Sequence, residues 1–395
     1  MSLLVFGPLE IPLGYSTNVH PGRDLDEARR SLENHAARVR ERVAPDRQLG
    51  VGLWLSARTV RELSGSPEAV ADFGRHLARA GLVAFTLNAF PFGDFHAERV
   101  KEEVYRPSWA DPRRREHTER AAAVLAALLP EGLGGSISTV GGGGRADGDD
   151  PATRHRMGAE LRRLDAALAD LERRTGRRIE LALEPEPLTT FERTPEIVDF
   201  FAEHLGGCDH LGVCLDVCHQ AVVFEDVAAS LTALRDGGVR VAKIQLSNAL
   251  EVVRPGTNGA GREALAAFAE DRYFHQIYAR FSDGRVDGRA DLPDAVPAAP
   301  PGWLEAEAWR VHFHVPVFAR DLGALSTTRP SLEAAIDWIQ RERYETHLEI
   351  ETYTWGVLPP AERARLGADL AEGIAAEFEW VLARGIMGAG TEDTR

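Results

Sequence analysis

The chain has 395 residues, 44% of them hydrophobic and 27% charged, and it carries a formal net charge of −15 at neutral pH. This is the composition of a globular protein long enough to bury a large core. The excess of acidic residues argues against duplex DNA or an anionic membrane as a partner, because phosphate groups are bound by clustered basic side chains.

No apolar run reaches the roughly 18 residues that a membrane span needs, and the N-terminal region lacks the basic and apolar segments of a signal peptide. The three cysteines, Cys208, Cys214 and Cys218, are odd in number and close together. They do not suggest a disulfide framework. We therefore expect a cytoplasmic protein whose thiols stay reduced.

Short apolar runs that predict strands alternate along the chain with longer amphipathic patterns that predict helices. The predicted strands are Leu13–Val19, Gly50–Leu55, Leu82–Leu87, Ser136–Val140, Ile179–Glu184, Leu211–Asp216, Val239–Leu246, Val311–Val315 and His347–Thr352. The predicted helices are Asp24–Val43, Pro67–Ala80, Arg114–Leu129, Ala152–Arg174, Pro195–Leu205, Val227–Asp236, Ser331–Arg341 and Ala361–Arg384. This alternation indicates a parallel sheet covered by helices, and we expect an α/β fold of the (β/α)8 TIM-barrel type.

Nine predicted strands exceed the eight of such a barrel by one, and Val311–Val315 is the expected extra strand. It falls in the interval 251–330, which also holds Pro- and Gly-rich stretches and a predicted hairpin around Ser282–Gly284. So long an interval after the seventh strand is expected to be an excursion over the mouth of the barrel. Residues 1–395 are thus expected to form a single domain, with a flexible tail at 387–395.

Acidic side chains stand at the ends of several predicted strands. Glu184, Asp216, Gln245 and Glu351 close the fifth to the eighth strands, and strand ends of a barrel meet at one rim. Three carboxylates at that rim would repel one another unless a cation neutralised them. Oxygen ligands favour Mg²⁺ or Mn²⁺, whereas added imidazoles shift the preference towards Zn²⁺, Fe²⁺ or Mn²⁺.

Histidines near these strand ends could supply the imidazoles. His219 follows Asp216 by three residues, so both can face one site only if the chain turns after Asp216. His312 and His314 are two residues apart, hence on one face of an extended segment, where they could chelate a metal. His275 is a further candidate from the excursion.

Each of these signals also has a purely structural interpretation. Glu184 with Glu186, and Glu349 with Glu351, could be carboxylates paired with arginines, and His219 could cap a helix. Lys243 points into the barrel, where a core salt bridge is expected in preference to a Schiff-base role. A common site is favoured because these candidate residues fall at the ends of consecutive predicted strands.

Leu183–Pro185, Leu215–His219 and Leu348–Thr352 resemble motifs of the xylose isomerase-like TIM-barrel superfamily, which contains sugar isomerases, epimerases and endonuclease IV. Longer segments resemble the EboE-type metabolite traffic proteins over nearly the whole chain. These segments are Tyr15–Gly22, Asn88–His96, Gly135–Thr139, Gln245–Leu250, His312–Pro316 and Glu351–Trp355.

This resemblance implies a divalent-metal barrel that acts in specialised metabolism. It also implies metal ligands at Glu184, Asp216, His219 and Glu351. The seventh-strand ligand, commonly histidine in the superfamily, is Gln245 here, so His275, His312 or His314 could supply the remaining imidazole.

Our leading hypothesis is a metal-dependent isomerase or epimerase of a small polyol, a sugar, a cyclitol or its phosphate. The metal would stabilise an enediolate, with Glu184 or Glu351 as general base and His219 as a further catalytic candidate. The expected substrate-binding residues are His20, Asn88, His96, Glu186, Lys243, His275, His312, Glu349 and Trp355.

Two alternatives stand beside this hypothesis. The first is phosphoester hydrolysis of the endonuclease IV type, with two or three zinc ions, which the supply of histidines favours and the net charge disfavours for DNA. The second is a non-catalytic barrel that binds or carries a metabolite, which the absence of a seventh-strand histidine favours. Neither nucleic acid nor a membrane is an expected partner. A homo-oligomer is compatible with all three hypotheses.

Overall fold

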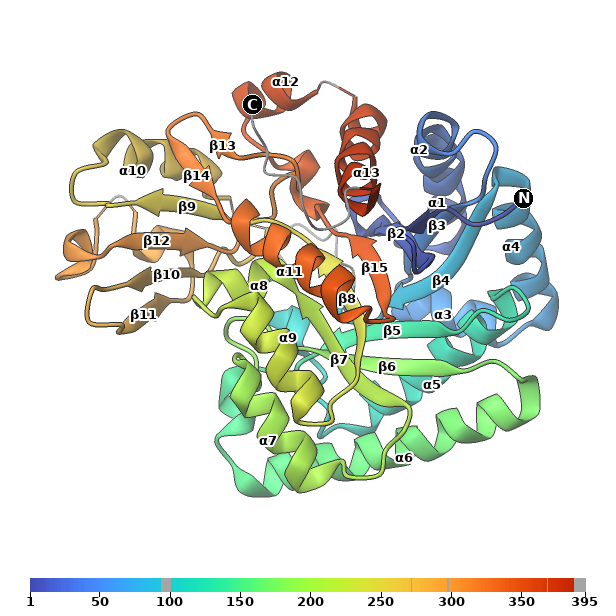
Figure 1. Cartoon of the computed structure of the whole chain (residues 1–395). Coiled ribbons are helices and arrows are strands. Elements are labelled where there is room, and N and C mark those ends of the chain that lie inside the picture. Colours follow the sequence, from blue (N-terminus) through green and yellow to red (C-terminus); the bar gives the residue numbers. More distant parts are fainter. Residues whose placement is uncertain (94–100, 271, 297, 368, 387–395) are drawn as a thin grey trace.

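The computed structural model describes residues 1–93, 101–270, 272–296, 298–367 and 369–386. Its centre is a closed barrel of eight parallel strands, in which the last strand pairs with the first (Figure 1). The barrel strands are β2 Ile11–Ser16, β3 Leu49–Trp54, β4 Leu82–Asn88, β5 Gly135–Val140, β6 Ile179–Glu184, β7 Leu211–Asp216, β8 Val241–Leu246 and β15 His347–Ile350. A short strand, β1 Val5–Phe6, pairs antiparallel with β2.

Helices surround the barrel because the strands are buried on both faces and need an apolar cover. The α-helices are α1 Leu25–Ser31, α2 Ala37–Val43, α3 Ala57–Ser64, α4 Pro67–Ala80, α5 Pro112–Leu128, α6 Pro151–Thr175, α7 Thr194–His204, α8 Val217–Val222, α9 Val227–Asp236, α10 Gly259–Leu265, α11 Arg329–Glu342, α12 Pro360–Leu366 and α13 Leu370–Ile386. In the part of the chain that the structure describes, no helix is long and apolar enough to cross a membrane.

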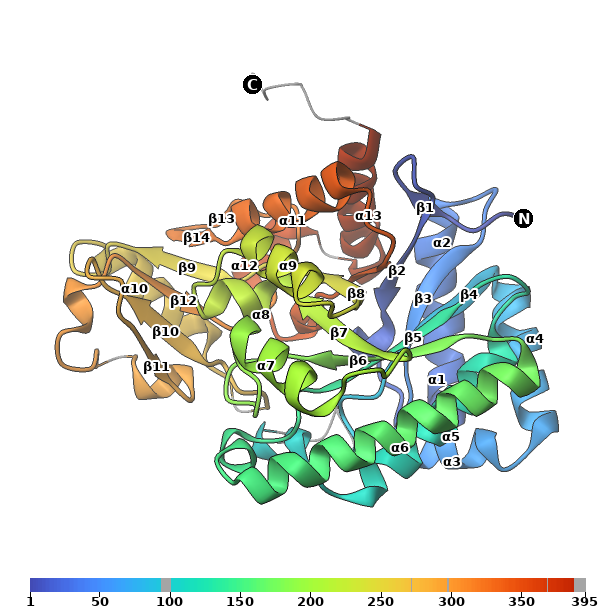
Figure 2. The same ribbon diagram turned by 60° about the horizontal axis from the view of Figure 1, so that its bottom comes forward.

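The chain between β8 and α11 forms a second, six-stranded antiparallel sheet beside the barrel (Figures 1 and 2). Its strands are β9 Leu250–Val253, β10 Ile277–Arg280, β11 Val286–Arg289, β12 Ala308–Val311, β13 Asp321–Leu322 and β14 Leu325–Thr327, in the order β11-β10-β12-β9-β14-β13. β10 and β11 pair antiparallel around Gly284, whose φ of 84° suits a tight turn, as the predicted hairpin requires. The segments before β10 and after β12 reach the barrel mouth.

The barrel and the excursion after its seventh strand confirm the predicted fold class. The predicted extra strand begins and ends earlier than expected, at Ala308–Val311, and it lies in the second sheet. The predicted helix Ala361–Arg384 is wrong, because Gly367 has a φ of 134° that interrupts it and separates α12 from α13. The predicted helix Asp24–Val43 starts at Leu25 and contains a π-helical segment at Leu32–Ala36. The predicted tail at 387–395 lies outside the described residues.

Candidate metal centre and pocket

Three buried carboxylates from different strands meet at the carboxyl end of the barrel. Glu184 ends β6, Asp216 ends β7 and Glu351 directly follows β15, and each has one carboxylate oxygen within 4.8 Å of the others. Each carboxylate also has one buried oxygen without a hydrogen-bond partner. These oxygens are Glu184 Oε2, Asp216 Oδ2 and Glu351 Oε2. Buried carboxylate oxygens can only accept, so this arrangement fits a cation.

The chain does turn after Asp216, as the pairing with His219 requires. Asp216 is the N-cap of α8, and its Oδ1 accepts a hydrogen bond of 3.0 Å from the backbone N–H of His219. The same oxygen accepts from the Ser247 hydroxyl at 2.7 Å. This cap brings the His219 ring back over the strand end, where Nδ1 lies 3.6 Å from Glu184 Oε1.

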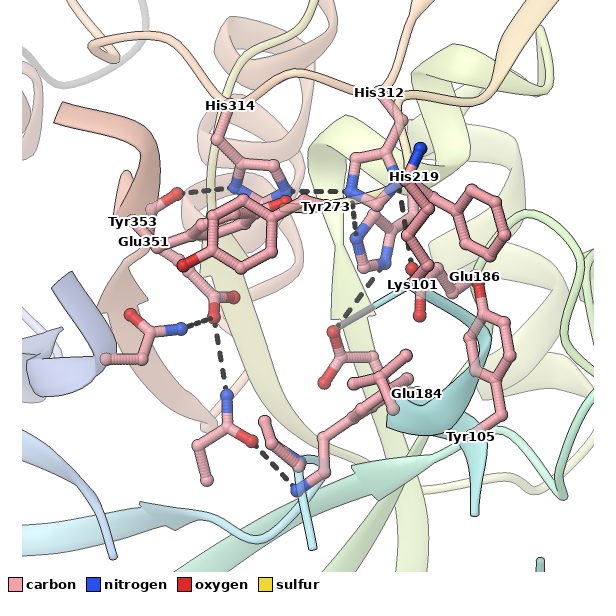
Figure 3. A pocket seen from close by; sticks show the side chains of 16 residues that line it. Lys101, Tyr105, Glu184, Glu186, His219, Tyr273, His312, His314, Glu351 and Tyr353 are labelled. Carbon is pink, nitrogen blue, oxygen red and sulfur yellow. Dashed lines mark hydrogen bonds and ion pairs between the residues drawn. The ribbon is translucent and has the colours of Figure 1, made fainter. Parts of the chain in front are cut away.

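Two further imidazoles reach the same place from the excursion. His312 and His314 follow β12, and their Nε2 atoms lie 3.2 Å apart, while His219 Nε2 lies 3.1 Å from His312 Nε2 (Figure 3). Two imidazole nitrogens on one tetrahedral Zn²⁺ would lie about 3.3 Å apart. His312 Nε2 is thus spaced from each of the other two rings as a second ligand of a shared cation would be.

The potential ligands form overlapping groups rather than one set. One group is all oxygen, Glu184 with Asp216 and Glu351, and a second joins Asp216 to His219 and His314. Two more groups lie around His312, and they add Glu186 with His219, or Cys218 with His314. Asp216 belongs to both the oxygen group and an imidazole group, so a centre with one cation or with two could be built from these residues.

Burial and mutual repulsion set the protonation of the carboxylates. Burial, followed by the negative charges of its carboxylate neighbours, raises the pKa of Glu184 well above its usual value, and the same holds for Glu351. Burial also raises the pKa of Glu186 to about 8. Asp216 behaves differently: burial opposes its ionisation, but His219, His314 and the Ser247 hydroxyl outweigh burial and lower its pKa.

The imidazoles are held in their neutral, metal-binding form. Burial lowers the pKa of His219 to about 4, and it also lowers the pKa of His312 and of His314. Neutral imidazole is the form that binds divalent metals.

A cavity of about 70 Å³ is lined on one side by the carboxyl groups and imidazoles of Glu184, Glu186, Glu351, His219, His312 and His314 (Figure 3). Its other wall is largely apolar and aromatic. That wall is made of Phe90, Pro91, Val104, Tyr105, Tyr273, Phe274 and Tyr353. Two amides complete the floor, since Asn18 Nδ2 donates to Glu351 Oε1 at 2.8 Å and Asn88 Nδ2 lies 3.4 Å from the same oxygen.

Three of the predicted site residues lie in a layer below the pocket. Lys243 Nζ forms an ion pair with Glu349 Oε2 at 2.6 Å, and both side chains are fully buried. Gln245 Oε1 accepts from the thiol of Cys214 at 3.1 Å, and its Nε2 lies 3.5 Å from Glu349 Oε2. None of these three lines the described cavity, and their roles in binding metal or substrate stay predictions.

Other predicted residues lie behind the pocket walls. His275 Nδ1 donates to the carbonyl oxygen of His312 at 2.9 Å, and its Nε2 lies 2.9 Å from Glu270 Oε1, so His275 supports the His312 segment from behind. His20 Nε2 bonds the Tyr15 hydroxyl at 2.9 Å. The Trp355 indole N–H donates to Glu377 Oε2 at 3.1 Å, and its ring packs on Gly373. His96 lies outside the described residues.

Several pocket residues were not predicted. Asn18 follows the first barrel strand and Tyr353 lies two residues beyond Glu351. Both could have been predicted, because residues just after the carboxyl end of a barrel strand lie at the rim. Lys101 lines the pocket from a 3-10 turn at Lys101–Tyr105, and its ammonium pairs with Asp291 from the excursion. The loops that carry Lys101 and Tyr273 gave no periodic signal.

No protein-family model matches the sequence, and no curated protein sequence matches it. Solved structures share the fold. A xylose isomerase-like TIM-barrel protein from Mycobacterium smegmatis, in complex with magnesium, is 12% identical, with a TM-score of 0.54 over 95% of this chain and 96% of that one. A D-allulose 3-epimerase from a Methylomonas species is 15% identical, with a TM-score of 0.52 over 96% of this chain and 100% of that one. At these identities the likeness shows the TIM-barrel fold.

Proposed function

We propose that this protein is a divalent-metal-dependent isomerase or epimerase of a small polyol: a sugar, a cyclitol or its phosphate. The observation that carries the proposal is the meeting of Glu184, Asp216 and Glu351, buried and with unpartnered oxygens, where Glu184 and Glu351 line a pocket with an aromatic wall. The structural likeness to a sugar epimerase and to a magnesium-bound barrel supports it. The resemblance to EboE-type proteins favours a cyclitol-like substrate of specialised metabolism.

The chain's own residues would bind and orient the cation and the polyol. Glu184, Asp216, Glu351 and His219 would hold the cation, with His312 or His314 as a further ligand. When bound, the cation would act as a Lewis acid and stabilise negative charge on neighbouring substrate oxygens. The aromatic wall would take the C–H face of a polyol, which leaves its hydroxyls towards the carboxylates.

A carboxylate next to the cavity would move the proton. The amides of Asn18 and Asn88 hold Glu351 Oε1 and leave Oε2 without a hydrogen bond. Glu351, or Glu184 across the cluster, would take the proton from the carbon beside the substrate carbonyl. For isomerisation it would return that proton to the neighbouring carbon, while a proton passes from the hydroxyl oxygen to the carbonyl oxygen. For epimerisation the other of the two carboxyl groups would protonate the opposite face of the same carbon. No proton or electron is gained or lost overall.

A second candidate function is metal-dependent phosphoester hydrolysis. The observation that favours it is the sharing of Asp216 between an oxygen group and an imidazole group, which allows more than one cation. Two cations per chain together with release of phosphate from a small phosphoester would support it. A content of about one cation per chain would weigh against it.

The test is solvent exchange during turnover. The metal-loaded protein is incubated in D₂O with a panel of ketoses, aldoses and keto-cyclitols, and deuterium at the carbon beside the carbonyl is followed by NMR. We expect exchange in the wild type, none in Glu351→Gln, and wild-type exchange in Glu62→Gln, whose side chain is exposed on α3. Full turnover by a metal-free preparation would reject the mechanism. Metabolite production supported in cells by Glu351→Gln would indicate a carrier instead.

A further inference from the structure

Gln276, which directly precedes β10, is a buried residue outside the candidate ligand groups. Its side chain is fully buried, and it contacts three different segments of the chain. Its amide nitrogen donates to the carbonyl oxygen of Pro187 at 3.2 Å and contacts the Tyr105 hydroxyl at 3.1 Å. Its amide oxygen lies 2.6 Å from Nδ1 of His312.

The partner at Pro187 fixes which way the amide faces. A backbone carbonyl can only accept a hydrogen bond, so the NH₂ group of Gln276 must face Pro187 and its oxygen must face His312. The amide oxygen can only accept in turn, so His312 must carry its proton on Nδ1. In a neutral imidazole the other nitrogen, Nε2, then carries a lone pair.

That lone pair is the one directed at the metal centre. His312 Nε2 is the atom that lies 3.1 Å from His219 Nε2 and 3.2 Å from His314 Nε2. The backbone N–H of His312 also donates to the carbonyl oxygen of Gln276 at 2.8 Å, so the residue is held in place by both its backbone and its ring. A chain of contacts thus runs from Pro187, which directly follows Glu186, through Gln276 to His312.

We propose that Gln276 is a positioning residue that selects the Nδ1–H tautomer of His312 and so makes its Nε2 available as a metal ligand. The proposal rests on the metal centre of the proposed function, but it does not depend on the reaction or the substrate. Partners of this kind on the outer nitrogen of a ligating histidine typically change metal affinity by roughly 10- to 100-fold.

The test is ¹⁵N NMR of the metal-free protein labelled at histidine, with His312→Gln used to assign the resonance. Two-bond couplings distinguish an Nδ1–H from an Nε2–H ring. We expect Nδ1–H at His312 in the wild type and a shift towards Nε2–H in Gln276→Met, whose thioether is only a weak acceptor. Nε2–H in the wild type would overturn the proposal, whatever the outcome for the catalytic mechanism.

Metal titration supplies the second readout. We expect the Zn²⁺ affinity of Gln276→Met to fall by roughly 10- to 100-fold. Gln276→Glu keeps an acceptor for the Nδ1–H and should retain both the tautomer and the affinity. Gln340→Met is the matched control, because it removes an amide of α11 that donates to the carbonyl oxygen of Arg384 in α13, and neither residue lines the pocket. Wild-type affinity in Gln276→Met, or equal losses in the Met and Glu variants, would contradict the proposal.

Discussion

His312 and His314 direct their Nε2 atoms at each other across 3.2 Å. Each ring already donates from Nδ1: His312 donates to Gln276 Oε1, and His314 donates to the carbonyl oxygen of Glu351, both at 2.6 Å. Two lone pairs therefore face each other in a buried site. A hydrogen-bond donor or a metal ion between or beside them would relieve the repulsion. With Asp216 and His219 next to them, this relationship favours a metal.

Asp216 is the residue whose loss should harm metal binding most, because it belongs to both the oxygen group and an imidazole group. Asp216→Asn preserves the cap of α8 but removes the charge. We expect the affinity for Mn²⁺ or Zn²⁺, measured by calorimetry, to fall roughly tenfold or more. Asp226→Asn is the control, since Asp226 caps α9 in the same way but is exposed and belongs to none of the candidate ligand groups. An equal loss in the two variants would count against the assignment.

Metal affinity should rise with pH. The pKa values of Glu184 and Glu351 are raised, first by burial, so protons must leave these carboxyls before a cation binds. The imidazoles add little to this dependence, because burial lowers their pKa values and keeps them neutral. Calorimetry between about pH 5 and about pH 8, in buffers of different ionisation enthalpy, should show proton release that declines as the pH rises. A flat affinity over this range would contradict the account.

The buried pair of Lys243 and Glu349 should be structural. Lys243→Met leaves the Glu349 carboxylate buried without its cation, and removal of one partner of such a pair costs about 3–5 kcal/mol. We expect denaturant unfolding to show a loss of that order. The double variant Lys243→Met/Glu349→Gln should recover part of it, because the orphaned charge is gone. No recovery in the double variant would mean that Lys243 acts other than through Glu349.

The fold and part of the site could be predicted from the sequence because the relevant signals are local. Barrel strands are short apolar runs that end on a carboxylate, which placed Glu184 and Asp216, and a spacing of two put His312 and His314 on one face. How deep in the barrel a strand residue places its side chain is not determined by the local sequence pattern. Gln245 was expected at the rim, but its partners Cys214 and Glu349 lie in the layer below.

The remaining pocket residues depend on how loops fold over the mouth. Tyr273 and Gln276 lie in an irregular segment of the excursion, and Lys101 begins a short turn, so no periodicity marks any of them. Their positions follow from tertiary contacts such as the ion pair of Lys101 with Asp291. Sequence patterns predict helices and strands well where hydrophobic residues recur at a regular period. Tertiary contacts between loops produce no such periodic pattern in the sequence.

The most direct test is elemental analysis of the purified protein, paired with thermal unfolding before and after chelation. The account predicts at least one equivalent of Mn²⁺, Zn²⁺, Fe²⁺ or Mg²⁺ per chain, a lower unfolding temperature after chelation, and recovery when the metal is returned. It also predicts that Asp216→Asn is purified with less metal. A protein that retains no divalent cation, and whose unfolding temperature no added cation raises, would contradict the central claim.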